Sequence, residues 1–403
     1  MKVLLIHQAF VSQGEAGGTR HFELARHCVK KGVSFTIVTS PISYLTGRDK
    51  RREPGSPFAG IEIIHAYTVK AHHKNFVWRV WAFVVFMFAS VVRGLRVREI
   101  DVVMGTTPPI FQAVSAWLLA ALRRKPFLLE VRDLWPEFAI DMGVLKNPSL
   151  IWLSRRLERF LYHRADHLLV NSPAYRTYLL DKGIAADNIT FIANGVDVPL
   201  FEVQSDGTFR RRFALEDKFL LVYAGALGLA NDIATLLRAM ALLKNRPEIH
   251  LLLAGDGKEK ENLQRLAAEL HVASVTFAGS VAKSDIPALL SEANVCVAIL
   301  QNIPMFKTTY PNKVFDYMAA GKPVLLAIDG VIREVVEQAQ CGIYAQPGDA
   351  RALAERIVYL YEHRQEAIVM GEHGRLYVQA HFNRRQQADA FYQLLNTLPG
   401  QAR

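Results

Sequence analysis

The sequence predicts an α/β protein of two Rossmann-like domains with a cleft between them. Short apolar runs alternate with amphipathic helical patterns through both halves of the chain, as in parallel sheets joined by helical crossovers. The length of 403 residues suits two domains better than one, since a domain usually has about 150 residues. With 51% apolar and 21% charged residues, the composition supplies two hydrophobic cores and argues against disorder.

Each domain is expected to hold its own parallel sheet, with helices in nearly every gap between strands. In the first half, the predicted strands are residues 2–7, 33–39, 61–67, 101–104, 126–131, 167–171 and 189–193. In the second half, they are residues 218–224, 249–254, 274–278, 294–300, 323–328 and 342–345.

The periodic pattern weakens over residues 198–217, which predicts an interdomain linker there. The expected domains are therefore residues 1–200 and 215–382. A last helical pattern, at about residues 383–398, has no strand after it. We expect this helix to cap one domain, or to return to the first and pack on it.

The cysteines and the first residues indicate a cytoplasmic protein. Only Cys28, Cys296 and Cys341 occur, with no Cys-x-x-Cys pair, which argues against a disulfide framework and a structural zinc site. The opening MKVLLIHQAF lacks the longer apolar stretch and the cleavage site of a signal peptide.

The net charge of +10 resides in the first half of the chain. Residues 1–200 hold 26 Lys and Arg against 16 Asp and Glu, whereas residues 201–403 hold 22 of each kind. A basic domain beside a neutral one suggests that the first domain meets something anionic: nucleic acid, an acidic membrane surface or a phosphorylated substrate.

Residues 80–92, VWAFVVFMFASVV, form a run of 13 without a charge. As a helix this run would be about 20 Å long, too short for a hydrocarbon core of roughly 30 Å. It is either a buried crossover helix or a helix that lies in a lipid interface, held there by flanking bases. In the second case the membrane contacts would be Arg79, Trp81, Arg93, Arg96 and Arg98.

Two loops after predicted strands of the first half are candidate ligand sites, because α/β sheets bind ligands at the carboxyl ends of their strands. The first loop ends in Gly17 and Gly18 before a helix near Arg20, where free N–H groups suit a phosphate or sugar oxygen. It lacks the Gly-x-Gly-x-x-Gly fingerprint, which argues against an NAD-dependent dehydrogenase. The second, EVRDLWPE at residues 130–137, brings four ionisable groups to one strand end. That loop either handles a polar ligand or is held together by salt bridges.

In the second half, glycines directly follow three predicted strands, in YAGALG (223–228), LAGDG (253–257) and FAGSV (277–281). Together they describe a lined cleft, although each alone is an ordinary strand-to-helix turn.

The segment 307–324, KTTYPNKVFDYMAAGKPV, is the richest candidate of the second half. Pro311 is suited to a helix start, and Lys313 and Asp316 then lie on nearly the same face. A cation at a helix N-terminus opposes the helix dipole, so Lys313 there favours a bound anion. The alternative is a solvated surface lysine.

On these residues the chain resembles glycosyltransferase family 4, the retaining, nucleotide-sugar-dependent enzymes of GT-B fold. It looks most like the branch that assembles bacterial surface polysaccharides such as O-antigen and capsule. The resemblance runs over essentially the whole chain and lies in GGTRHFELA, EVRDLWPE, LERFLYHRAD, IANGVD, LLAGDG and PNKVFDYMAAGKPV.

The resemblance implies a donor site in the second domain. The family's acidic residue for the nucleotide ribose matches Asp316, while its partner eight residues earlier matches Thr308, which is no acid. The family's phosphate-binding Arg and Lys match Ala226 and Asn231, so Lys313 becomes the best cation for the diphosphate. The donor-binding residues implied are Gly17, Gly18, Gly225, Gly279, Val281, Lys307, Asn312 and Asp316.

The resemblance also implies that the first domain binds the acceptor. The family's His before the interdomain cleft matches Arg132, with Asp133 following. We expect Asp133 to position the acceptor or support the oxocarbenium charge, Arg132 to hold sugar or phosphate, and Lys313 to complete the catalytic set.

The implied reaction moves a sugar, an N-acetylated or deoxy hexose, from a nucleoside diphosphate, with uracil the commoner base. The sequence has no Asp-x-Asp pair, so Lys and backbone N–H groups would meet the leaving-group charge without a metal or other cofactor. The acceptor implied is a polyprenyl-diphosphate-linked saccharide, which would place the enzyme on the inner face of the cell membrane.

Two rival functions stay open: a nucleotide-sugar 2-epimerase of the same fold, and a non-catalytic protein that binds sugar or lipid. Nucleic acid is not an expected partner, because the basic residues are scattered and form no recognisable binding module.

Overall fold

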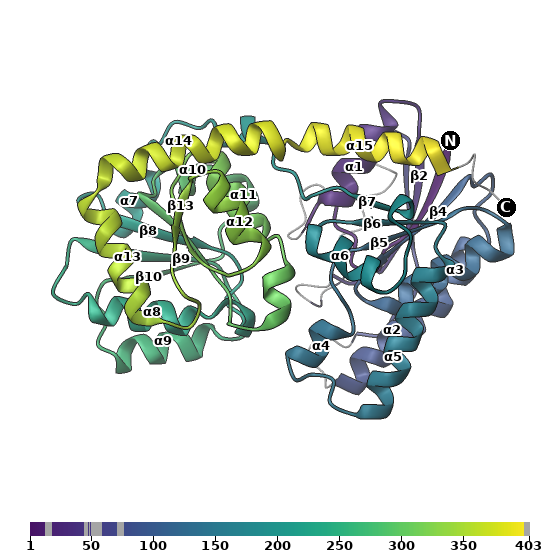
Figure 1. Cartoon of the computed structure of the whole chain (residues 1–403), viewed down its shortest axis with the longest axis horizontal. Coiled ribbons are helices and arrows are strands. Elements are labelled where there is room, and N and C mark those ends of the chain that lie inside the picture. Colours follow the sequence, from purple (N-terminus) through teal and green to yellow (C-terminus); the bar gives the residue numbers. More distant parts are fainter. Residues whose placement is uncertain (13–17, 44–46, 48, 50–58, 71–75, 399–403) are drawn as a thin grey trace. The chain divides into compact units, whose positions relative to one another are not determined.

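The computed structural model describes residues 1–12, 18–43, 47, 49, 59–70 and 76–398. The chain divides into two compact units: unit 1, Met1–Ala193 with Arg385–Arg403, and unit 2, Asn194–Arg384. Each unit is built on a parallel sheet with helical crossovers, so the predicted α/β class with two Rossmann-like domains is confirmed (Figure 1).

Unit 1 has a seven-stranded sheet in the order β3-β2-β1-β4-β5-β6-β7, with every pair parallel. Because helices cover both faces of such a sheet, its central strands are buried along their whole length. All seven predicted strands are present: β1 (Lys2–Ile6), β2 (Ser34–Thr39), β3 (Ile61–His65), β4 (Val102–Thr107), β5 (Phe127–Val131), β6 (His167–Val170) and β7 (Ile189–Phe191).

The helices of unit 1 are α1 (Arg20–Val29), α2 (Phe76–Gly94), α3 (Ile110–Arg123), α4 (Glu137–Asp141), α5 (Pro148–Arg164), α6 (Pro173–Asp181) and α15 (Arg384–Thr397). Helix α15, yellow in Figure 1, lies beside α1. Its Phe391 and Leu395 join Phe22 and Phe35 in the core cluster of unit 1. The last helix therefore returns to the first unit and completes its core.

The uncharged run 80–92 lies within α2, which is a 19-residue helix and thus longer than predicted. One side of α2 packs on α3: Phe86 is fully buried, and Ser90 Oγ donates to Ser115 Oγ at 3.0 Å. The other side exposes Trp81 (52%) and Phe88 (64%). The packed face agrees with the buried-crossover interpretation, while the exposed face leaves the lipid-interface interpretation as a prediction. Among the helices within the described part of the chain, none is long and apolar enough to cross a membrane.

Unit 2 has a six-stranded sheet in the order β10-β9-β8-β11-β12-β13, again entirely parallel. All six predicted strands are present: β8 (Phe219–Ala224), β9 (Ile249–Ala254), β10 (Val275–Gly279), β11 (Val295–Ile299), β12 (Val324–Ala327) and β13 (Gly342–Tyr344). The helices are α7 (Thr208–Phe213), α8 (Ile233–Leu242), α9 (Lys260–Glu269), α10 (Ile286–Ser291), α11 (Asn312–Ala319), α12 (Val331–Gln338), α13 (Ala350–Glu362) and α14 (Arg364–His381).

Residues 198–217, where the sequence predicts the linker, are instead part of unit 2. The helix α7 within them buries Phe209, and the backbone N–H of Arg210 donates to Glu292 at 2.7 Å. The Arg210 guanidinium also donates to the Glu292 carbonyl and to Asn294 Oδ1, both at 2.8 Å. The arginine run that marked the segment as polar is thus one of its anchors.

We predict that Phe391→Ala lowers the free energy of unfolding of unit 1 by about 3–5 kcal/mol, because it leaves a cavity under α15. Chemical denaturation followed by circular dichroism measures the change. Gln393→Ala on the exposed side of the same helix is the control and should change stability little. Equal stability of the two variants would contradict the structural role of α15.

Candidate functional site

Lys313 is the central cation at the carboxyl edge of the sheet in unit 2. It is the second residue of α11, two positions after the N-cap Pro311, so it lies at a helix start as the sequence predicts. Its Nζ donates to Tyr223 Oη at 2.9 Å and to Asn231 Oδ1 at 3.0 Å, and it lies 4.1 Å from the centre of the Tyr223 ring. Strand β8 and the turn after it therefore hold the ammonium group from one side.

Both hydrogen-bond acceptors of Lys313 are neutral. Among the described residues, no carboxylate lies within ion-pair distance of its Nζ. Removal of the ammonium from water lowers the pKa of Lys313 from 10.5 to about 7. A group in this state gains free energy from a nearby anion, because the anion restores the charge that the protein disfavours.

The glycines of this edge allow close approach of neighbouring backbone and of Lys313. A Cβ on Gly225 would stand 2.9 Å from Lys313 Nζ, and a Cβ on Gly255 would stand 1.8 Å from the Gly225 carbonyl oxygen. The loop after β8 is also fixed by Tyr317, whose Oη accepts from the Ala224 N–H at 3.0 Å. Side chains larger than glycine at these strand ends would disrupt the turn that frames Lys313.

The other residues expected at the donor site have mixed surroundings. Lys307 makes an ion pair with Asp329 at 3.0 Å, so part of its charge is already compensated. Asp316 is partly buried in the second turn of α11, and Asn312 is exposed at its first residue. Gly279 has a φ of +75° with open space beside it, and Val281 follows two residues later and is partly buried.

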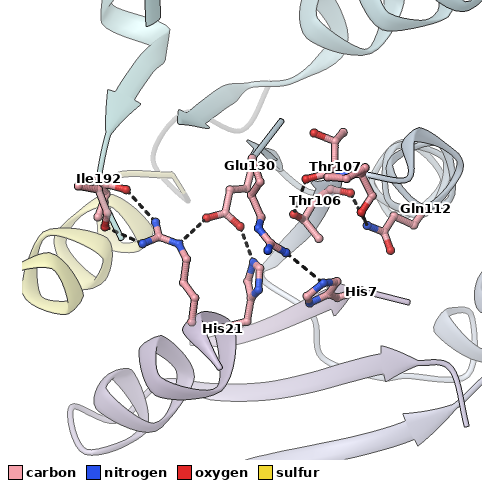
Figure 2. A network of polar contacts seen from close by, with 11 residues as sticks. His7, His21, Thr106, Thr107, Gln112, Glu130 and Ile192 are labelled. Carbon is pink, nitrogen blue, oxygen red and sulfur yellow. Dashed lines mark hydrogen bonds and ion pairs between the residues drawn. The ribbon is translucent and has the colours of Figure 1, made fainter. Parts of the chain in front are cut away.

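A buried polar network lies at the carboxyl edge of the sheet in unit 1 (Figure 2). Glu130 of β5 accepts from Arg20 Nε at 2.9 Å and from His21 Nε2. Burial alone would raise the pKa of Glu130, but His21, Arg20 and Arg132 together hold it well below its usual range. The side chain of Glu130 is therefore an ionised structural anchor.

The guanidinium of Arg20 also ties the start of α1 to the end of unit 1. It donates to the carbonyl oxygens of Ile192 at 2.9 Å and of Ala193 at 2.7 Å. The predicted pair Gly17 and Gly18 precedes this arginine. Gly17 lies outside the described residues, and Gly18 is exposed, with nothing within 4 Å of a Cβ built on it.

The loop after β5 separates the four ionisable groups that the sequence brings together. Glu130 and Glu137 are engaged in structural ion pairs, the second with Arg155 at 2.8 Å, as the salt-bridge interpretation predicts. Arg132 donates to His7 Nε2 at 3.3 Å. Asp133 is partly buried, and the loss of water raises its pKa to about 6 although Arg132 opposes the rise.

Sequence reasoning missed the positioning roles of five residues. Tyr223 and Asn231 hold Lys313, and the signal for Tyr223 was a polar aromatic at the end of an apolar strand. His7, Arg20 and His21 surround Glu130 and Arg132. A charged Glu130 inside an apolar strand was a signal for them, because a buried carboxylate needs partners.

Two family models match successive parts of the chain. "Glycosyl transferase 4-like domain" matches residues 16–195, and "Glycosyl transferases group 1" matches residues 205–377. Together with the two parallel-sheet units, these matches show that the chain belongs to the glycosyltransferases of GT-B fold.

Similar proteins include two bacterial relatives and one solved structure. "Probable glycosyltransferase WbjE" of Pseudomonas aeruginosa is 28% identical over 280 residues, which cover 68% of this chain and 69% of the relative. "Lipopolysaccharide core biosynthesis glycosyltransferase LpsE" of Rhizobium meliloti is 29% identical over 41% of this chain and 46% of its own length. The crystal structure of Anabaena HepE in complex with UDP superposes with a TM-score of 0.74 at 19% identity, covering 99% of this chain and 100% of HepE.

The low pKa of Lys313 predicts a pH-dependent contribution to stability. Its pKa is about 7 in the folded chain and 10.5 in the unfolded chain, so between these values the unfolded chain binds more protons. The free energy of unfolding should therefore rise from pH 7 to pH 10 relative to Lys313→Met, and the difference should be constant below about pH 6. Chemical denaturation of both proteins across this range measures it. A difference that does not change with pH would show that Lys313 keeps an ordinary pKa.

Proposed function

We propose that the chain is a retaining, metal-independent glycosyltransferase that transfers a hexose from a UDP-sugar to a lipid-linked saccharide in bacterial surface-polysaccharide synthesis. The observation that carries the proposal is Lys313: a partly buried ammonium between two neutral oxygens, at the strand edge where α/β sheets bind ligands. The diphosphate of the donor is the anion that this arrangement fits.

In this proposal Lys313 binds the diphosphate together with backbone N–H groups of the glycine-rich turns after β8 and β9. Tyr223 and Asn231 orient the ammonium. Asp316 takes the ribose hydroxyls, Gly279 and Val281 adjoin the base, and Asn312 and Lys307 border the phosphates. Gly225 allows the close approach, because a Cβ there would occupy the space next to Nζ.

The choice of UDP is supported by HepE, whose crystal structures are described as complexes with UDP and with UDP and glucose. A polysaccharide acceptor is supported by the name of LpsE, which refers to lipopolysaccharide core biosynthesis. For this chain we propose an N-acetylated or deoxy hexose as the transferred sugar and a polyprenyl diphosphate as the lipid of the acceptor.

The proposed step breaks the bond between the sugar C1 and the leaving phosphate oxygen and forms a bond from C1 to the acceptor oxygen on the same face. The acceptor proton passes to the departing phosphate oxygen. Lys313 stabilises the negative charge that develops on that phosphate. Asp133 positions the acceptor hydroxyl or supports the positive charge on the sugar, and Arg132, held by His7, binds a sugar or phosphate oxygen.

A membrane-bound acceptor is compatible with the exposed face of α2. We propose that Trp81 enters the lipid interface of the inner face of the cell membrane and that the flanking bases, Arg79, Arg93, Arg96 and Arg98, face anionic headgroups.

Lys313→Ala should lower turnover at least about 100-fold, because it removes the cation that meets the leaving-group charge. The assay follows nucleoside diphosphate release from a panel of nucleotide sugars, with and without a lipid-linked saccharide. Lys244→Ala, at an exposed position, is the matched control and should keep full turnover.

Three outcomes of this assay would contradict the proposal. Near-normal turnover of Lys313→Ala would remove Lys313 from the site. Activity that a chelator abolishes and magnesium restores would contradict the metal-independent step. Conversion of the donor sugar without an acceptor would instead favour the epimerase.

The pKa of Asp133 predicts the acidic limb of the pH profile. Because burial raises this pKa to about 6, the carboxylate should ionise, and turnover should rise, as the pH increases through about 6. Asp133→Asn should lower turnover about 10-fold to 100-fold and remove this limb. The exposed Asp187→Asn is the control and should retain it. A profile with the same limb in both variants would exclude Asp133.

A further inference from the structure

Helix α5 presents a groove that the proposed donor site and the loop of Arg132 do not use. The groove has a volume of about 1000 Å³ and is lined by residues of α5 with Lys182 from the end of α6. Part of its wall, including Arg159 and Phe160, comes from LERFLYHRAD, residues 157–166, a motif to which the proposed reaction assigns no role.

Large apolar side chains are exposed along this helix. Trp152 is 60% exposed, Leu153 57% and Leu150 47%. A solvated helix normally carries polar residues on its outer face, so this ridge indicates a surface that is covered in the working protein.

The charge of the same face is positive. The one acidic residue of α5, Glu158, is fully buried and bonded to Lys182 and to Tyr178 Oη. Arg156 and Arg159 make no ion pair with any residue that the structure describes. The Arg156 guanidinium lies 5.0 Å from the centre of the Trp152 ring, which keeps the cation next to the apolar ridge.

This face is joined to the site of unit 1 and to its helical layer. Arg155 donates through two nitrogens to Glu137 at 2.8 Å, at the end of the loop that carries Arg132 and Asp133. Helices α5 and α2 both pack against α3. The ring of Phe160 meets that of Trp117 of α3 edge-on, with the centroids 4.8 Å apart.

We propose that the outer face of α5 is a docking surface for the anionic phospholipid headgroups of a bilayer. Uncompensated arginines beside an exposed Trp and two Leu fit an interface in which the apolar side chains enter the acyl boundary and the guanidinium groups bind phosphate oxygens. Nucleic acid fits less well, because its phosphates would meet the arginines but leave Leu150 and Leu153 in water. The surface is separate from α2, so this proposal does not depend on the contact proposed for that helix.

The test compares the full-length protein with Arg156→Glu/Arg159→Glu in co-sedimentation with vesicles of phosphatidylcholine, with and without phosphatidylglycerol. Wild type should bind the anionic vesicles, and the double variant should bind them at least tenfold more weakly, since each basic residue near the headgroups contributes to affinity. Trp152→Ala should also weaken binding. The charge-matched control is Arg238→Glu/Lys244→Glu, which lies on exposed positions of unit 2 and should bind like wild type.

A circular dichroism spectrum and a thermal unfolding midpoint equal to those of wild type establish that the double variant is folded. The proposal would be overturned if the double variant bound anionic vesicles as tightly as wild type does. It would also be overturned if wild type bound vesicles with and without phosphatidylglycerol equally well. A third result would also overturn it: wild type is a dimer in analytical ultracentrifugation and the double variant is a monomer. The partner of this surface would then be a second copy of the chain. Reversal of the four bases that flank the exposed face of α2 tests that helix separately. Loss of binding there alone would support the α2 contact and refute the role of α5.

Discussion

The hydrogen bonds of Lys313 to Tyr223 and Asn231 are the interaction on which the proposed chemistry depends. They hold a cation at a helix N-terminus, where the helix dipole and the loss of water both disfavour its charge. The turn after β8 lies close to this cation, since a Cβ on Gly225 would stand 2.9 Å from its Nζ. The unit therefore holds Lys313 in a position where its charge is unfavourable, which is why we propose that an anion binds there.

Unit 1 contains the opposite case, a buried carboxylate. Glu130 accepts hydrogen bonds from Arg20 and His21, which compensate its charge and fix the position of the chain. Its neighbour Asp133 lies beside the cation Arg132, and burial raises the pKa of Asp133 to about 6. Two carboxyl groups three residues apart thus differ in environment. Glu130 is held ionised by its partners, whereas the pKa of Asp133 lies where a change in its surroundings would alter its protonation.

The fold could be predicted from the sequence because apolar runs of strand length mark every strand of both sheets. The position of Lys313 at the start of a helix was also predictable, since Pro311 precedes it. Its partners were not, because Tyr223 and Asn231 lie 90 and 82 residues away and only the folded sheet brings them to Nζ. The segment 198–217 was wrongly predicted as a linker for a related reason. Its arginines are typical of a linker in sequence, and only the folded unit brings Arg210 to Glu292. The length of helix α2 was underestimated because the uncharged run ends at Arg79 and Arg93, whereas the helix continues past both residues.

The placement of α15 has a consequence for synthesis on the ribosome. Phe391 and Leu395 fill the same core as Phe22 and Phe35, although the whole of unit 2 lies between these two pairs in the sequence. During translation, the first unit emerges early but stays without one layer of its core until the last helix has left the exit tunnel. Its apolar surface beside α1 is therefore uncovered while the second unit is made, and nascent chains should need protection from aggregation for that interval.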